Sequence, residues 1–213
     1  EDSPIVESVK PLRTVKAVSE NLDAIGAPEV WKLPDTNGLS LQGEGIIIAI
    51  ADTGIDLNHS EFAGSFVPGW NFVNNTAVAQ DDHTHGTHCA GIARGGPVVP
   101  GVAPKAKLMP LKCLSETGVG AEDWIIGAIE FAYANGAHVI SLSLGGGGTP
   151  EDEQCLAINH AHELGMLCCV AAGNGGPGAS TVLSPGMAKN AICVAALCLP
   201  SQLTGAIGWC KGP

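Results

Sequence analysis

Basic side chains and long apolar runs are scarce in this sequence, and each scarcity excludes a class of function. Ten Lys and Arg stand against 21 Asp and Glu, which gives a net charge of −11. Because binding to a nucleic-acid backbone needs clustered Lys and Arg, these scattered basic residues exclude nucleic acid as an expected partner. No apolar run approaches the roughly eighteen residues that a membrane-spanning helix requires, so we expect no membrane partner either.

Aromatic residues are also few, at 4% of 213 residues, so the core must come mainly from aliphatic side chains. Hydrophobic residues make up 45% of the chain and charged residues 15%, which is typical of a globular domain. The length fits one domain. Residues 1–20 are aperiodic and indicate an N-terminal arm, a propeptide remnant or a linker, and residues 21–213 are predicted to form the domain.

Short apolar runs alternate with helical patterns along the chain. One helix is predicted over 121–136, which opens with acids and closes on an Asn-Gly pair. A second is predicted over 149–164, with Thr149 as its N-cap and Pro150 in its first turn. Strands are expected at 46–51, 107–114, 137–144, 166–172 and 190–196. This alternation predicts an α/β fold with a doubly wound parallel sheet and helices on both faces.

Polar residues beside glycine follow three of the predicted strands. Asp52 stands in ADTG, Ser143 in SLGG and Asn174 in AAGNGG. In doubly wound sheets, ligands bind beyond the carboxyl ends of the strands. The architecture alone therefore nominates these three positions as site residues.

Three histidines, His83, His85 and His88, crowd the segment DDHTHGTHCAG. A helical zinc site needs two His four positions apart with a Glu between them, a pattern that this segment lacks, so we expect no metal. A His-x-His pair with a distant third ligand is a weaker alternative, because His85 directly precedes helix-forming residues. The third interpretation is a catalytic base, oriented by Asp52 and accompanied by an oxyanion donor from Asn174.

The segment GNGGPG at 173–178 matches the glycine pattern of a dinucleotide-binding loop. That pattern requires a helix after its last glycine and an acidic residue about twenty positions later. Pro177 and Pro185 keep the following residues out of a helix, and no Asp or Glu occurs after Glu163. We therefore expect no nucleotide cofactor.

Five segments together resemble the subtilisin-like serine protease family. They are IIIAIADTGIDLNHSEF, HGTHCAG, GVAPKAKLMPLKCL with the following WIIGAIEFAYANGAHVISLSLGG, VAAGNGG, and STVLSPGMAKNAICVAA. The resemblance runs from about Asn21 to the C-terminus and would cover the N-terminal and central part of the catalytic domain. In HGTHCAG it is closest to the thiol-bearing branch that resembles proteinase K.

The resemblance implies a serine endopeptidase that hydrolyses peptide bonds with an Asp-His-Ser triad. Asp52 would orient the base, His85 would be the general acid–base, and Asn174 would donate to the oxyanion. The substrate, a peptide or protein in extended conformation, would contact two backbone edges and a pocket wall. These residues are Gly118, Val119, Gly120, Ser143, Leu144, Gly145, Ala172 and Gly173.

The main departure from the family is that its nucleophile segment, of the type GTSMAxPH, has no match here. We expect that the chain stops before its nucleophile and is inactive alone, and that its partners include the C-terminal part as a separate chain. The apolar surface of residues 164–213 would then be exposed. The alternatives are a noncatalytic peptide-binding relative or one half of a split protease.

Three smaller expectations follow from the resemblance. The segment that corresponds to the family's calcium loop is short, which leaves Glu61 and backbone carbonyls as a thin ligand supply, so we expect no cofactor. Cys89 is a buried thiol beside the base, through which mercurials would inhibit. The protein is expected to be secreted or extracellular, with an intracellular location as the alternative.

Overall fold

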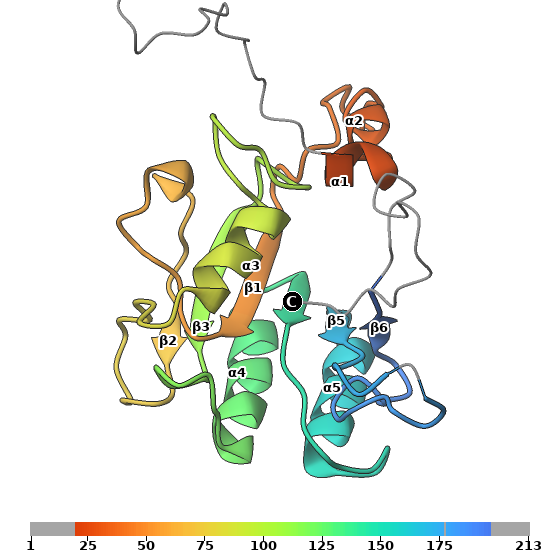
Figure 1. Ribbon diagram of the computed structural model, residues 1–213. Coiled ribbons are helices and arrows are strands. Elements are labelled where there is room, and N and C mark those ends of the chain that lie inside the picture. Colours follow the sequence, from red (N-terminus) through yellow and green to blue (C-terminus); the bar gives the residue numbers. More distant parts are fainter. Residues whose placement is uncertain (1–19, 177, 197–213) are drawn as a thin grey trace, which may run out of the picture.

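A six-stranded parallel sheet runs through the described part of the chain, residues 20–176 and 178–196 of the computed structural model (Figure 1). Its strands lie in the order β2-β3-β1-β4-β5-β6. In chain order the elements are α1 (Glu20–Ala24), α2 (Ala27–Val30), β1 (Ile47–Asp52), the 3₁₀ turn η1 (Ser60–Phe62), β2 (Trp70–Asn71), α3 (His85–Ala93), β3 (Lys107–Lys112), α4 (Glu122–Ala134), β4 (Val139–Leu142), α5 (Glu153–Glu163), β5 (Leu167–Ala171) and β6 (Ile192–Val194).

All five strands predicted from the sequence are present, and each lies within two residues of its expected bounds. The strand that the sequence did not predict, β2, has two residues and pairs with the end of β3. A segment this short is too brief to show a hydrophobic period. The prediction of a doubly wound α/β fold is confirmed.

Side chains of β1 alternate between two apolar cores, one on each face of the sheet. Ile48 and Ile50 pack with Ala90 of α3. Ala49 and Ala51 belong to the larger core that α4 and α5 cover on the other face. Because successive strand residues point to opposite faces, a run of apolar residues is needed for a strand buried on both sides. The helices on both faces hold β1 at the centre.

Both long helices begin close to their predicted positions, but one predicted cap is wrong. The α4 helix ends at Ala134, before the predicted Asn-Gly pair. The α5 helix begins at Glu153, and its N-cap is Asp152 rather than Thr149. The carboxylate of Asp152 accepts hydrogen bonds from the backbone amides of Cys155 at 2.9 Å and Thr149 at 3.2 Å. A carboxylate that satisfies two free amides displaces the threonine hydroxyl as the cap.

The predicted arm at residues 1–20 lies outside the described residues, apart from Glu20, which begins α1. The division between arm and domain therefore stays a prediction. Among the described residues, none of the helices has the length and apolar character needed to cross a membrane.

Candidate active site

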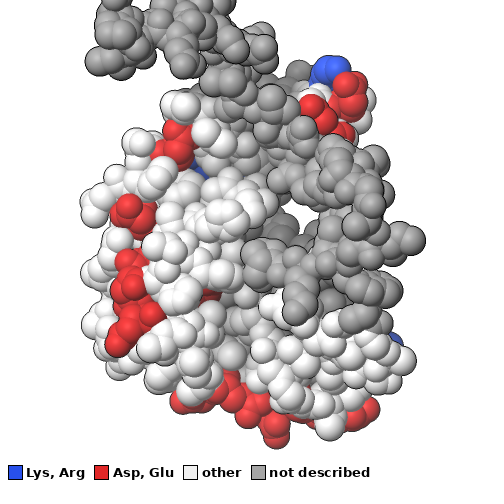
Figure 2. Space-filling view, in the orientation of Figure 1, with Lys and Arg blue, Asp and Glu red and all other residues white. Residues whose placement is uncertain are grey.

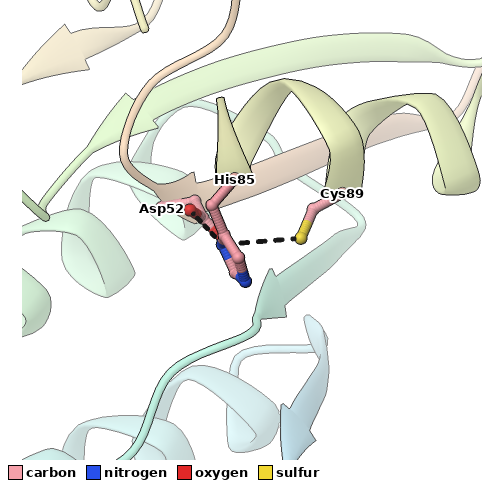
Figure 3. A group of neighbouring side chains, drawn as sticks. All are labelled: Asp52, His85 and Cys89. Atoms are coloured by element: carbon pink, nitrogen blue, oxygen red, sulfur yellow. Dashed lines mark hydrogen bonds and ion pairs between the residues drawn. The ribbon is translucent and has the colours of Figure 1, made fainter. Parts of the chain in front are cut away.

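The Asp52 carboxylate and the His85 ring face one another at the carboxyl end of β1 (Figure 3). The Nδ1 atom of His85 lies 2.8 Å from Oδ1 and 2.9 Å from Oδ2 of Asp52. Since a carboxylate can only accept, Nδ1 carries the hydrogen and Nε2 is left as the acceptor. In Figure 3 the second ring nitrogen points away from Asp52, and His85 lines a groove. A histidine held in this way can take a proton from a group in that groove.

A close approach of α3 to β1 brings these two residues together. Asp52 ends β1, is 1% exposed, and accepts a further hydrogen bond from the backbone amide of Thr53 at 2.7 Å. His85 is the first residue of α3. A Cβ on the next residue, Gly86, would overlap the carbonyl oxygen of Gly54 and lie 3.1 Å from the Asp52 Cβ. A glycine at this position is therefore what allows the helix to start against the strand end.

Asp81 ties the start of α3 to the end of β1, a role that the sequence analysis did not assign. Its carboxylate accepts hydrogen bonds from the amides of His83 (2.9 Å), Thr84 (3.0 Å) and Thr87 (3.0 Å), and from the hydroxyls of Thr53 (2.8 Å) and Thr87. Burial alone raises the pKa of Asp81, but these hydrogen bonds outweigh it and lower the pKa to about 2. An Asp shortly before a helix start is a capping signal that could have revealed it.

Lys112 is a second residue that the sequence analysis missed. Its side chain is 1% exposed, and it is the register partner of Asp52 in the neighbouring strand. Its Nζ donates to the carbonyl oxygens of Thr53 and Leu114, each at 2.8 Å, and to Asp82 Oδ1 at 2.6 Å. These three bonds fix both strand ends and the segment that leads to the histidines. A lysine within an apolar run gives no sequence signal of such burial.

The thiol of Cys89 lies beside the pair, as Figure 3 shows, with Sγ 3.8 Å from His85 Nδ1. Burial raises the pKa of Cys89 to about 11, so the thiol stays protonated near neutral pH. Among the described residues, Asp52, His85 and Cys89 are the one group whose ligand atoms lie close enough to hold a metal ion, within 4.8 Å of one another. The expectation that the chain holds no metal stays a prediction.

Protein donors engage most of the oxygens around Glu61, where the sequence left a calcium site in doubt. The Glu61 carboxylate accepts hydrogen bonds from the backbone amides of Val98 at 3.2 Å and Val99 at 3.1 Å. The carbonyl oxygen of Glu61 accepts from Arg94 Nη1 at 2.6 Å, and the same guanidinium binds two further backbone carbonyls. Calcium needs several oxygen ligands that are free to face it. Here N–H donors and a guanidinium cation already engage Oε2 and the carbonyl oxygen of Glu61, and the expectation of no cofactor stays a prediction.

A groove of about 700 Å³ lies between the segment after β3 and the segment after β4. His85 lines it, as does Asn174, which follows β5. Six of the eight predicted substrate residues also line it: Gly118, Val119, Gly120, Ser143, Leu144 and Gly145. The structure thus brings together the catalytic and most of the substrate positions that the sequence nominated.

The remaining two predicted substrate residues, Ala172 and Gly173, are not among the groove-lining residues. Backbone hydrogen bonds hold Ala172 on both sides, from its amide to Val194 O at 2.8 Å and from the Leu183 amide to its carbonyl at 3.0 Å. Gly173 has a φ of 90°, and a Cβ there would lie 2.6 Å from the Leu183 side chain. Their assignment to a specificity pocket stays a prediction.

The other two histidines of the opening segment differ in position. The His83 ring lies 6.3 Å from the His85 ring and lines the same groove. The simplest expectation for His88, that it packs within the fold, is wrong. His88 is exposed and lines a second cavity of about 800 Å³, together with residues of 56–62 and 99–101. It lies two positions from each of the buried residues Gly86 and Ala90, which places it on the opposite side of α3.

Comparison with known proteins places the chain among proteases. Residues 43–204 match the model of the peptidase S8 group, described as the subtilase family. The chain is 40% identical to thermitase of Thermoactinomyces vulgaris over 176 residues, which cover 80% of this chain and 59% of thermitase. The solved structure of sphericase superposes with a TM-score of 0.69 at 34% identity, covering 81% of this chain and 59% of sphericase.

Two relatives from Bacillus subtilis bear names that give different locations. The minor extracellular protease Vpr is 35% identical over 200 residues, which cover 86% of this chain and 24% of that protein. The major intracellular serine protease is 35% identical over 175 residues, which cover 77% of this chain and 52% of that protein. The chain spans no more than 59% of the length of these three curated relatives.

Proposed function

This chain belongs to the subtilase family, and we propose that it supplies the acid, the base and the oxyanion donor of a subtilisin-like serine endopeptidase. The observation that carries the proposal is the pair Asp52–His85, joined at 2.8 Å, with His85 lining a groove of about 700 Å³. The relatives named as serine proteases support the reaction class.

In the proposed reaction, the Nε2 atom of His85 takes the proton of a serine hydroxyl as the serine oxygen bonds to the peptide carbonyl carbon. Asp52 stabilises the imidazolium that forms and fixes the ring through its hydrogen bond to Nδ1. His85 then gives the proton to the leaving amine as the C–N bond breaks. Water next releases the acyl group by the same two proton transfers in reverse.

Asn174 is proposed to stabilise the negative charge that develops on the carbonyl oxygen. It lines the groove with His85 and follows the strand next to β4. Its side-chain amide offers two N–H donors, which a carboxylate in the same place could not provide. Donors already aimed at a developing oxyanion need no rearrangement during the reaction.

The substrate is proposed to be a peptide or protein segment in extended conformation. The segment 118–120 forms one wall of the groove and 143–145 forms the other. Backbone groups on both walls could pair with an extended chain as added strands do. This binding mode needs little from substrate side chains, so it tolerates many sequences.

The proposal places the nucleophilic serine outside these 213 residues, in a C-terminal part on the same or another chain. Among the described residues, the hydrogen-bond partners of His85 are Asp52 and Cys89, and no serine is one of them. A serine-directed fluorophosphonate probe should leave the 213-residue chain unlabelled in mass spectrometry. Covalent labelling of any serine in it would contradict this part of the proposal.

The assigned roles predict a graded loss of activity in the natural protein that contains this chain. Replacing His85→Ala should lower kcat by roughly 10⁶, Asp52→Asn by roughly 10⁴ and Asn174→Ala by roughly 10²–10³. Cleavage of a quenched fluorogenic peptide, with labelling to count active sites, measures all three. Peptide binding without cleavage in the unmodified protein would instead identify a noncatalytic peptide-binding relative.

Secretion is the proposed location, which suits an endopeptidase acting on proteins outside the cell. The relatives named as extracellular and intracellular support both locations equally, so fractionation of the source cells has to separate them. Recovery of the protein only from the cell interior would contradict secretion.

A further inference from the structure

One carboxylate lines the groove, and it belongs to Glu122 in the first turn of α4. No other Asp or Glu, and no Lys or Arg, is among the described residues that line it. Ile125 lies three positions further along the same helix and also lines the groove. Because residues three apart share a helix face, one face of α4 presents both side chains there. We call Glu122, Ile125 and Gln154 the Glu122 subsite.

The Glu122 carboxylate keeps most of its capacity to accept hydrogen bonds. Its one side-chain partner among the described residues is Gln154, whose Nε2 donates to Oε1 at 3.3 Å. Within the same part of the chain, no Lys or Arg forms an ion pair with Glu122. An ionised carboxylate can accept several hydrogen bonds, so its Oε2 is free for an incoming cation.

An apolar floor lies beside this carboxylate. Ile125 and Leu114 are each 7% exposed and line the groove together with Leu144. Long basic side chains place their methylene stems on apolar surface while their charged heads reach a polar partner. The subsite offers both features, since Ile125 can contact a stem while Glu122 and the Gln154 carbonyl oxygen receive the cationic head.

The surface around the Glu122 subsite is also negatively charged. Figure 2 shows Asp and Glu side chains gathered along the lower edge of the molecule, where α4 and α5 lie in Figure 1. The exposed acids at the starts of these helices are Glu122, Asp123, Glu151 and Glu153. A single-sign field of this kind raises the local concentration of cationic ligands. It would disfavour acidic peptides at the same place.

We infer that the Glu122 subsite selects a basic residue, Lys or Arg, at one position of the bound peptide. The inference rests on the proposed function, because it requires that the groove binds peptides. It names a substrate class that the backbone edges alone would not select. The head group would pair with the Glu122 carboxylate, and the stem would cover Ile125.

The test compares peptides that differ only in one charge. A fluorescent peptide of small neutral residues is made with arginine at each position in turn, and a matched set carries the neutral isostere citrulline. Binding to the 213-residue chain is followed by fluorescence anisotropy at low ionic strength. At one position, arginine should bind up to roughly fivefold tighter than citrulline, the upper end of the range for an exposed ion pair. Equal binding of arginine and citrulline at every position would overturn the inference.

Substitutions at two positions of α4 separate the subsite from the general field of the helix start. Glu122→Gln should bring the arginine-to-citrulline ratio to about one, and Glu122→Lys should invert it. Asp123→Asn removes the same charge from the next residue, which is exposed but does not line the groove, and should keep most of the preference. An equal loss in Asp123→Asn and Glu122→Gln would overturn the assignment to Glu122.

The proposed function and this inference fail in different ways. If none of the peptides binds the chain, the groove is not a peptide site, and both fall together. If peptides bind without any preference for arginine, the proposed function stands and only the Glu122 subsite is refuted. Thermal unfolding of each variant, followed by circular dichroism, confirms that the compared chains are folded.

Discussion

Asp81 concentrates five hydrogen bonds on one carboxylate at the start of α3, and its replacement tests how firmly His85 is held. Asp81→Asn keeps the shape but removes the charge and turns one acceptor into a donor. Since hydrogen bonds to a charged group are stronger than neutral ones, we expect a loss of about 1–3 kcal/mol in the free energy of unfolding at pH 7. Urea unfolding measures it.

The pH dependence of that loss follows from the lowered pKa of Asp81. The pKa is about 2 in the folded chain against 3.8 for an ordinary Asp. The stability it contributes is therefore present above about pH 4 and disappears as pH falls toward 2. The difference between the original chain and Asp81→Asn should shrink over that range. The exposed Glu130→Gln serves as control, and an undiminished difference at pH 2 would contradict the role.

Cys89 offers a second test at single-residue scale, which needs no activity. Because burial raises its pKa to about 11, only about one thiol in 10⁴ is ionised at pH 7. Alkylation by iodoacetamide should be about two orders of magnitude slower than for an ordinary exposed thiol, and should rise about tenfold per pH unit up to pH 9. Peptide mapping by mass spectrometry follows the rate of alkylation at Cys89. Rapid labelling at pH 7 would contradict the raised pKa that follows from the partial burial of Cys89.

If the natural protein is a protease, the position of Cys89 also predicts that mercurials inhibit its activity. Since Cys89 Sγ lies 3.8 Å from His85 Nδ1, a mercurial bound to the sulfur would displace the ring from Asp52. Inhibition by mercurials should therefore disappear in Cys89→Ser. Persistent inhibition in that variant would point to another of the cysteines.

At the scale of elements, two glycines of α3 allow a matched comparison. Gly86→Ala would force the new Cβ against the Gly54 carbonyl and the Asp52 Cβ, so α3 must move away from β1. We expect a loss of about 2–4 kcal/mol in the free energy of unfolding. Gly91→Ala adds a Cβ in open space on the same helix and should stabilise it by up to about 1 kcal/mol.

Calorimetry of both variants separates the effect of the close approach of α3 to β1 at Gly86 from the effect of an added alanine on the helix itself. If Gly86→Ala is as stable as Gly91→Ala, the close approach of helix and strand is not needed. A nuclear magnetic resonance signal from the His85 Nδ1 proton reports the pair directly. It should weaken in Gly86→Ala and persist in Gly91→Ala.

The elements that the sequence predicted well are those whose pattern is local. β1 follows from its run of apolar residues, and α4 from its acids at the start and its Asn-Gly end. Thr149 shows the limit of local prediction. Thr149 and Asp152 are both good N-cap residues, and only the fold decides whether the hydroxyl or the carboxylate meets the free amides. β2 was missed because two residues cannot show a period.

The residues of the candidate site also divide into those that the sequence could name and those that it could not. Asp52, His85 and Asn174 could be named because each follows or begins an element beside glycine, where a parallel sheet presents side chains to a ligand. Asp81 could have been named from its place before a helix start, but Lys112 could not, because its role depends on which distant backbone groups reach it. The sequence does not show whether a lysine buries its ammonium group or only its methylene stem. Only three-dimensional contacts distinguish the two cases.

At the scale of the whole molecule, charge and apolar surface are separated along the chain. All 21 acidic residues occur up to Glu163, and the strands that follow carry exposed apolar side chains. Leu167 is 48% exposed, Ile192 50% and Val194 54%. The expectation of exposed apolar surface after residue 164 is confirmed for the described residues. Among the described strands, β6 lies at one edge of the sheet, and an edge strand is a template for pairing with another chain.

The β6 edge should therefore drive association between copies of the 213-residue chain. Repulsion between chains of net charge −11 opposes it, so association should grow as salt screens that charge. Sedimentation velocity at about 100 µM, without and with added salt, measures the effect. Val194→Lys places a charge on the edge and should keep the chain monomeric, as lysines do on natural edge strands.

Val98→Lys is the matched control, because Val98 is 77% exposed but lies in a loop away from β6. It adds the same charge and also removes an exposed valine, so it lowers the net repulsion without protecting the edge. Association should persist in Val98→Lys and be lost in Val194→Lys. If both variants stay monomeric to the same extent, total charge rather than the β6 edge controls association. A chain that stays monomeric at high salt without any substitution would show that the exposed strand is not adhesive.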